Sequence, residues 1–282
     1  MGRATRLIII AAGLLNVWPF LASAADPPAA PEDKQWNVRL GLFKRIAEQV
    51  TVYAETTGGK QAQPKMMTEP LYRYRQKTRS TPDAIVWGWT DGGRPAAICT
   101  LACTLDGDFR MLTYEFDRLS AKPLACEIDG QETWTPRGGL EMTAFPGAAA
   151  PADDAAARLK QATALVAKLK GSEVYNNAPP GQPPEGDLVW LPKPVHRYSD
   201  AKQGIIDGFL CLSCIDANPE VVLVLEAQRN DKGAPVWRYG FNRIAFAELH
   251  IFLDDKEIWT APHLSGTSSD DAYHLKAVRL HR

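Results

Sequence analysis

The feature that most constrains the fold of this chain is an internal repeat. Residues 70–74 return as residues 194–198, with proline, arginine and tyrosine at the same places. Further matches follow, first at the same spacing and then at a spacing one residue longer: Asp83 and Asp207, Pro95 and Pro219, Tyr114 and Tyr239, Phe116 and Phe241, Arg118 and Arg243, Asp129 and Asp254, Glu132 and Glu257, Trp134 and Trp259, and Thr135 and Thr260. A repeat of this period predicts one structural unit written twice.

A helical pattern precedes the repeated block in each copy. Apolar residues recur three or four positions apart at Leu40, Phe43, Ile46 and Val50, and again at Leu159, Ala162, Leu165, Val166 and Leu169. This spacing predicts a helix at the start of each copy. Asp153 and Asp154 precede the second helix, where acidic side chains favour the positive end of the helix dipole.

Short strands in an antiparallel meander are predicted after each block. They span 84–90, 96–103, 109–116, 123–128 and 132–135 in the first copy, and 209–215, 220–227, 236–241 and 249–253 in the second. Asp-Gly pairs at 91–92, 106–107 and 129–130 favour hairpins, because glycine accepts the positive φ of a tight turn. The continuously apolar run 221–225 predicts a central strand covered on both faces.

The predicted fold class is therefore α+β, with two tandem copies of a helix followed by a four- or five-stranded antiparallel meander. We place the first copy over 36–150, the second over 151–262 and a C-terminal tail over 263–282. Proline-rich residues 178–185 are expected to form a solvated connection.

The first 24 residues have the pattern of a signal peptide. Arg3 and Arg6 precede an apolar run over 7–15, and small residues at 22–24 allow cleavage near Ala24. We expect export to the periplasm or beyond the cell, with a proline-rich tether over 25–35. The alternative is an uncleaved anchor, but Asn16 and Pro19 interrupt the roughly 20 apolar residues that a spanning helix needs.

Charge and hydropathy limit the partners. The 32 basic and 33 acidic residues give a net charge of -1, so no overall attraction to nucleic acid is predicted. No later segment is apolar enough to span a membrane, and the partner is left open, with a cell-envelope component as one option. The 45% of hydrophobic residues is ordinary for a folded globular protein.

The five cysteines give a weak signal for metal or redox chemistry. Cys211 and Cys214 have the spacing of a redox pair, but residues three apart in a strand lie about 10 Å apart on opposite faces. Cysteines at four positions match apolar or small residues of the other copy, as Cys211 matches Trp87, so buried thiols are expected, with a disulfide or a metal site as alternatives. No histidine pair has ligand spacing, and neither a metal nor a cofactor is predicted.

An arginine and an aspartate ten residues apart recur in both copies, as Arg73 with Asp83 and as Arg197 with Asp207. A bidentate contact within each pair would hold the repeated block on the following strand, which is a structural role. The functional alternative is that these four residues line a cleft between the copies and bind an anionic ligand.

Three enzyme classes lack their usual motif in this sequence. Neither a nucleophile elbow, a phosphate-binding loop nor a His-Glu-x-x-His helix occurs. Paired carboxylates need no motif, so Asp83 with Asp207, or Glu132 with Glu257, are candidates for a hydrolase site between the copies.

Two tryptophans share one strand face in the first copy. Trp87 and Trp89 are two residues apart, so both are expected either to pack beneath a helix or to form an exposed binding platform. We favour packing.

Residues 191–198 read Leu-Pro-Lys-Pro-Val-His-Arg-Tyr, followed by Asp207-Gly208 and a tail from Trp237 to Trp259. This segment resembles uncharacterised exported bacterial proteins with a Leu-Pro-x-Pro-aliphatic-x-Arg-Tyr block, a resemblance that implies no activity. The leading hypothesis is a non-catalytic exported module that binds a ligand or partner at the junction of the copies, or is structural. An Asp/Glu-dependent hydrolase is the alternative, and whether the chain is an enzyme stays open.

Overall fold

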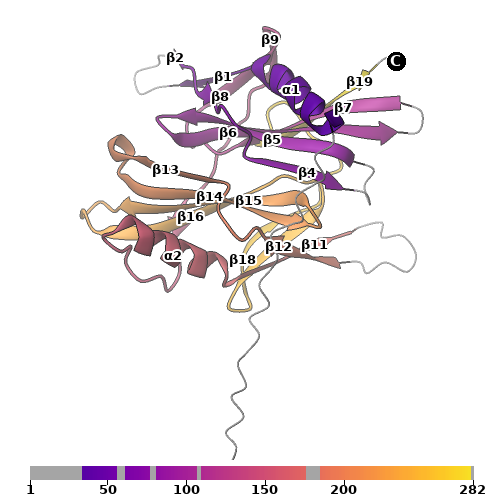
Figure 1. Cartoon of the computed structure of the whole chain (residues 1–282). Helices are drawn as coiled ribbons and strands as arrows, with labels where there is room; N and C mark the ends of the chain where they lie inside the picture. The colour runs from indigo at the N-terminus through magenta and orange to yellow at the C-terminus, as the bar shows by residue number, and fades with distance from the viewer. Residues whose placement is uncertain (1–33, 56–60, 77–80, 107–108, 176–184, 281–282) are drawn as a thin grey trace, which may run out of the picture. The chain divides into compact units, whose positions relative to one another are not determined.

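The computed structural model describes residues 34–55, 61–76, 81–106, 109–175 and 185–280 (Figure 1). The predicted signal peptide, nearly all of the predicted tether and most of the proline-rich connection lie outside the described residues. Residues 32–282 cluster as one compact unit, which contains both predicted copies. No helix in the described ranges has the length and apolarity to cross a membrane.

The protein is mostly β, with 56% strand, 12% helix, and two α-helices and three sheets among the described residues. The predicted α+β fold of two helix-plus-meander copies is therefore wrong. The predicted strands coincide with observed strands, apart from residues 123 and 135, which lie just outside them. Each half also contains strands directly after its helix and at the repeated block. The strands directly after the helices pair with strands distant in sequence, whereas those at the repeated block pair with the next strand along the chain.

We call α1 to β9 the first half and α2 to β18 the second half. The first half consists of α1 (Lys34–Glu48), β1 (Val50–Glu55), β2 (Gln61–Ala62), β3 (Lys65–Met66), β4 (Tyr72–Gln76), β5 (Thr81–Asp91), β6 (Arg94–Asp106), β7 (Phe109–Arg118), β8 (Leu124–Ile128) and β9 (Gln131–Trp134). The linking strand is β10 (Thr143–Ala144). The second half consists of α2 (Ala155–Val166), β11 (Leu169–Val174), β12 (Glu185–Trp190), β13 (His196–Asp200), the 3-10 turn η1 (Ala201–Gln203), β14 (Ile205–Ile215), β15 (Asn218–Arg229), β16 (Pro235–Arg243), β17 (Glu248–Leu253) and β18 (Lys256–Ala261). The last strand is β19 (Tyr273–Leu280).

Each half contains a long three-stranded hairpin ladder, β5–β6–β7 or β14–β15–β16. Strand β1 pairs with β8 in the first half, as β11 pairs with β17 in the second. In the second half β12 also pairs with both β11 and β14, which joins nine strands into one sheet. The first half keeps a six-stranded and a four-stranded sheet.

The strand that follows each half in sequence belongs to the sheet of the other half. Strand β10 follows the first half in sequence but pairs with β16, and β19 follows the second half but pairs with β7 along its whole length. Figure 1 shows β19, in yellow, beside β7 of the first half. Neither half is therefore complete without the end of the other.

Three apolar clusters of packed side chains lie between the layers of the fold. Alternation along β5 sends Ile85 and Trp87 to a cluster under α1, and Ala84 and Val86 to a central cluster. The central cluster also contains Val222 of β15, so the two halves meet through packed side chains. The third cluster lies under α2.

Strand β15 is central and buried over residues 219–227, which confirms the prediction for run 221–225. Its odd-numbered residues Val221 and Leu223 face the cluster under α2, and Val222 and Val224 face the central cluster. Burial on both faces explains why the run is continuously apolar.

An arginine stabilises the chain after the last ladder strand in each half. The Arg118 guanidinium donates to the carbonyl oxygens of Ser120, Ala121, Lys122 and Pro136. The Arg243 guanidinium donates in the same way to Ala245, Phe246, Ala247 and Pro262. This repeated contact satisfies carbonyl groups that turn away from the sheets, and it gives both matched arginines a structural role.

Candidate ligand pocket

The Arg73 and Asp83 side chains form a bidentate ion pair. Arg73 Nε and Nη2 lie 3.0 and 2.6 Å from the Asp83 carboxylate, and Arg39 of α1 adds a contact of 2.8 Å. The Asp83 side chain is fully buried. These contacts fix β4 and α1 to the start of β5.

Arg197 and Asp207 make the matching arrangement in the second half. Arg197 Nε and Nη2 lie 2.8 and 2.6 Å from the Asp207 carboxylate, and Arg158 of α2 lies 2.9 Å from it. Arg197 also donates to the carbonyl of Ala155 at the start of α2. The hydrogen bond and the charge of Asp207, although opposed by partial burial, raise the pKa of Arg197.

The structure does not bring the four candidate residues to one cleft. Asp83 has the strand parity of Trp87 and faces the layer of α1, whereas Asp207 has the parity of Phe209 and faces the layer of α2. The central cluster lies between those two strand faces. A shallow hollow contains Arg158, Arg197 and Asp207, but their groups already bond to one another and to the backbone at the start of α2.

The structure also places the candidate glutamates and the cysteines. Glu132 and Glu257 are exposed, and the Glu257 carboxylate lies 2.6 Å from His250 Nδ1. All five cysteines are free thiols, four of them buried. Among the described residues no group of three or more potential ligands is placed to hold a metal ion. Trp87 and Trp89 are buried at 1% and 2% exposure, so they form no surface platform.

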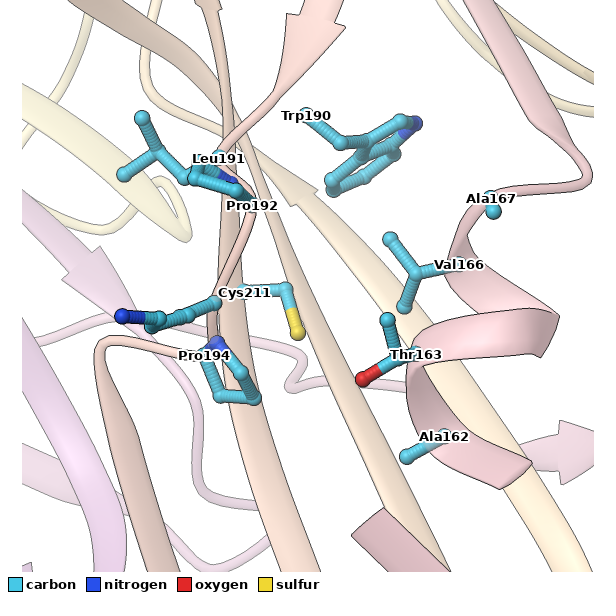
Figure 2. Close-up of a pocket in the computed structure, with 10 residues that line it drawn as sticks. Ala162, Thr163, Val166, Ala167, Trp190, Leu191, Pro192, Pro194 and Cys211 are labelled. Atoms are coloured by element: carbon cyan, nitrogen blue, oxygen red, sulfur yellow. The ribbon is translucent and has the colours of Figure 1, made fainter. Parts of the chain in front are cut away.

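An apolar pocket lies between α2 and the Leu-Pro-Lys-Pro segment (Figure 2). Its volume is about 130 Å³. The lining residues are Ala162, Thr163, Val166, Ala167, Trp190, Leu191, Pro192, Lys193, Pro194 and Cys211. Figure 2 shows Ala162, Thr163 and Val166 on α2 facing Cys211 and Pro194 across the space. Helix α2 supplies this wall. Its first turn is stabilised by Asp154, whose side chain accepts a hydrogen bond from Ala157 N at 2.8 Å.

In the first half, two buried aromatic rings stand at the positions that match the Cys211 and Ala162 side of the pocket. Position 211 matches position 87, and the ladders agree: Cys211 lies opposite Leu223 as Trp87 lies opposite Cys99. The contacts of Arg158 with Asp207 and of Arg39 with Asp83 hold α2 and α1 at matching positions on their sheets. Ala162 of α2 therefore lies where α1 has Phe43. Phe43 and Trp87 are 3% and 1% exposed in one cluster, so small residues at both places open the pocket in the second half.

The pocket lining contains one aromatic residue, Trp190, and one charged residue, Lys193. Trp190 replaces Met66 of the first half and packs on Phe241, with ring centroids 6.2 Å apart. Burial raises the pKa of the Cys211 thiol to about 12, so the thiol stays protonated near neutral pH and behaves as an apolar group. Lys193 at the rim is exposed.

Sequence reasoning missed this pocket although its signal was visible. The match of Cys211 with Trp87 indicated only a buried thiol, which is what the structure has. To predict an open pocket, one must also know that the helix keeps its distance from the sheet where the two rings are absent. The Arg158–Asp207 contact maintains that distance, and only the structure reveals it.

Scans of protein-family models, curated proteins and solved structures found no match to this chain.

Proposed function

We propose that this protein is a non-catalytic exported module that binds a small apolar ligand in the pocket between α2 and residues 191–194. The observation that carries the proposal is the difference between the halves. The same layers enclose packed aromatic rings in the first half and an open space beside Cys211 in the second.

The size of the space suits one ring system. Apolar cavities of roughly 150 Å³ bind benzene in engineered proteins, and this pocket has about 130 Å³. Burial of apolar surface supplies the driving force, at about 25 cal/mol per Å². For a ligand of this size we expect a Kd on the order of 0.1–1 mM.

The absence of catalysis is part of the proposal and rests on the chemistry of the candidates. Asp83 and Asp207 are each engaged by two arginines, on separate faces. The Cys211 thiol remains protonated, so it is a poor nucleophile. Export rests on the signal-peptide pattern of the first 24 residues.

Calorimetric titration of the mature chain with toluene and with naphthalene tests the proposal. We expect saturable binding to the wild-type chain and to Cys211→Ala, which leaves the space open. Cys211→Trp should weaken binding at least tenfold, because the new ring occupies the site. Absence of saturable binding, or equal binding to Cys211→Trp and the wild type, would refute a ligand site here.

A further inference from the structure

The first half indicates which chemical group the second-half pocket accepts. The Trp87 indole packs between α1 and β5, and its Nε1 donates to the carbonyl of Met67 at 2.7 Å. An indole therefore fits the space between α1 and β5 and also donates a hydrogen bond to one backbone carbonyl.

The matching acceptor in the second half is the carbonyl of Leu191. Met67 N donates to Gly88 O at 2.9 Å, and Leu191 N donates to Leu212 O at 2.9 Å, which are matched positions of the repeat. The backbone thus follows the same course beside both strands. Leu191 lines the pocket, and the Cys211 side chain carries no N–H group that could replace the indole donor.

The remaining walls suit a flat aromatic ring. Trp190 supplies an aromatic ring to the lining where the first half has the flexible Met66, and offset or edge-on aromatic pairs add about 0.5–1.5 kcal/mol beyond area burial. Ala162 gives the room that Phe43 fills in the first half.

We infer that the ligand belongs to the indole class, a fused aromatic ring system with one N–H donor directed at the Leu191 carbonyl. This inference rests on the proposed function and adds the hydrogen-bond donor to it. The bound ring takes the place of the Trp87 side chain, so the protein's own first half serves as the template.

Indole and benzofuran separate the two claims, because benzofuran has nearly the same shape with an oxygen in place of the N–H group. In titrations of the mature wild-type chain we expect indole to bind about five- to tenfold more tightly than benzofuran, as one net hydrogen bond implies. Cys211→Ala should keep this preference, and Cys211→Trp should bind neither compound.

Equal affinity for indole and benzofuran would overturn the donor inference and leave the apolar site intact. Binding of neither compound to the wild-type chain would overturn both. If Cys211→Trp does not fold by circular dichroism, Ala162→Phe blocks the same space from the helix side and carries the same expectation.

Discussion

At two positions of the repeat, the second half carries a small residue where the first half carries a ring. Cys211 and Ala162 correspond to Trp87 and Phe43, and the space they leave is part of the pocket. Unfilled apolar volume in a protein costs stability, since the lining atoms lose contacts. A space kept open at this cost in stability is what we expect of a site that a ligand fills.

The free energy of unfolding should therefore respond in opposite directions to matched substitutions. Cys211→Trp fills the pocket and is expected to stabilise the chain by about 0.5–2 kcal/mol. Trp87→Cys empties the same place in the first half and should cost about 3–5 kcal/mol. Denaturant unfolding measures both, and a loss of several kcal/mol for Cys211→Trp would mean that the space is too small for the ring.

Asp117 is a second residue with a testable cost. It is fully buried, and the amide of Asn242, its counterpart in the repeat, donates to Asp117 Oδ1. Burial raises the pKa of Asp117 well above its usual value, although the charge of Arg243 opposes this. The folded state therefore holds the Asp117 proton more tightly than the unfolded state does. The stability that protonated Asp117 contributes is fully present below the unfolded pKa of about 3.9 and is lost as pH rises through the folded pKa.

Asp117→Asn removes the charge and keeps the shape. We expect the variant to be more stable than the wild type by about 1–2 kcal/mol at pH 7, with the difference shrinking towards pH 4. Unfolding titrations across that range measure it. Lower stability of the variant at pH 7 would show that the carboxylate is favourably solvated or paired.

At the scale of elements, the exchange of β10 and β19 makes each half depend on the other. Tyr273 at the start of β19 is 2% exposed, and its ring packs against Phe246 of the second half. Strand β19 also covers the edge of β7. The C-terminal strand is therefore part of the first half's sheet despite its place in the sequence.

Truncation after residue 271 should loosen the first half more than the second. With β19 removed, β7 becomes an edge strand, and its amides should lose hydrogen-exchange protection. Amides of β15, which lies between β14 and β16, should keep theirs and provide the internal control. Unchanged protection over residues 111–118 would contradict the pairing.

The β17–β18 hairpin contains a histidine between two carboxylates. His250 Nδ1 lies 2.6 Å from Glu257 and Nε2 lies 3.1 Å from Glu248. Partial burial lowers the pKa of His250, but the hydrogen bonds and charges of both glutamates outweigh it and raise the pKa above 6.5.

The contribution of this cluster to stability is complete below the unfolded pKa of about 6.5 and is lost as pH rises through the folded pKa. An NMR titration of His250 should give a midpoint above 6.5, and Glu257→Gln should lower it. His274, whose pKa burial lowers, should titrate below 6.5 in the same spectra. A His250 midpoint at or below that of His274 would contradict the geometry.

Over the whole molecule, local patterns predicted the ladders but not their assembly. Asp-Gly turns located β5 and β6, and a continuous apolar run located β15, because those signals lie within a few residues. Strands β1 and β11 escaped prediction because their partners, β8 and β17, are distant in sequence.

The exchanged strands carried even less local signal. Residues Thr143 and Ala144 of β10 are exposed, and Val278 and Leu280 of β19 are each 38% exposed, so neither strand has a clear buried face. The arginine–aspartate pairs were predictable from their spacing, whereas the faces to which they belong depend on the packing of three layers. The same packing decides that the pocket lies under α2 rather than between the halves.

Methyl NMR during an indole titration tests the central claim most directly. Ala162 and Val166 line the pocket, and Ala47 occupies the matching position to Val166 in the packed first half. We expect saturable shifts of the Ala162 and Val166 methyl signals with the Ala47 signal unmoved. Shifts of all three together, or of none, would contradict a ligand site created by the difference between the halves.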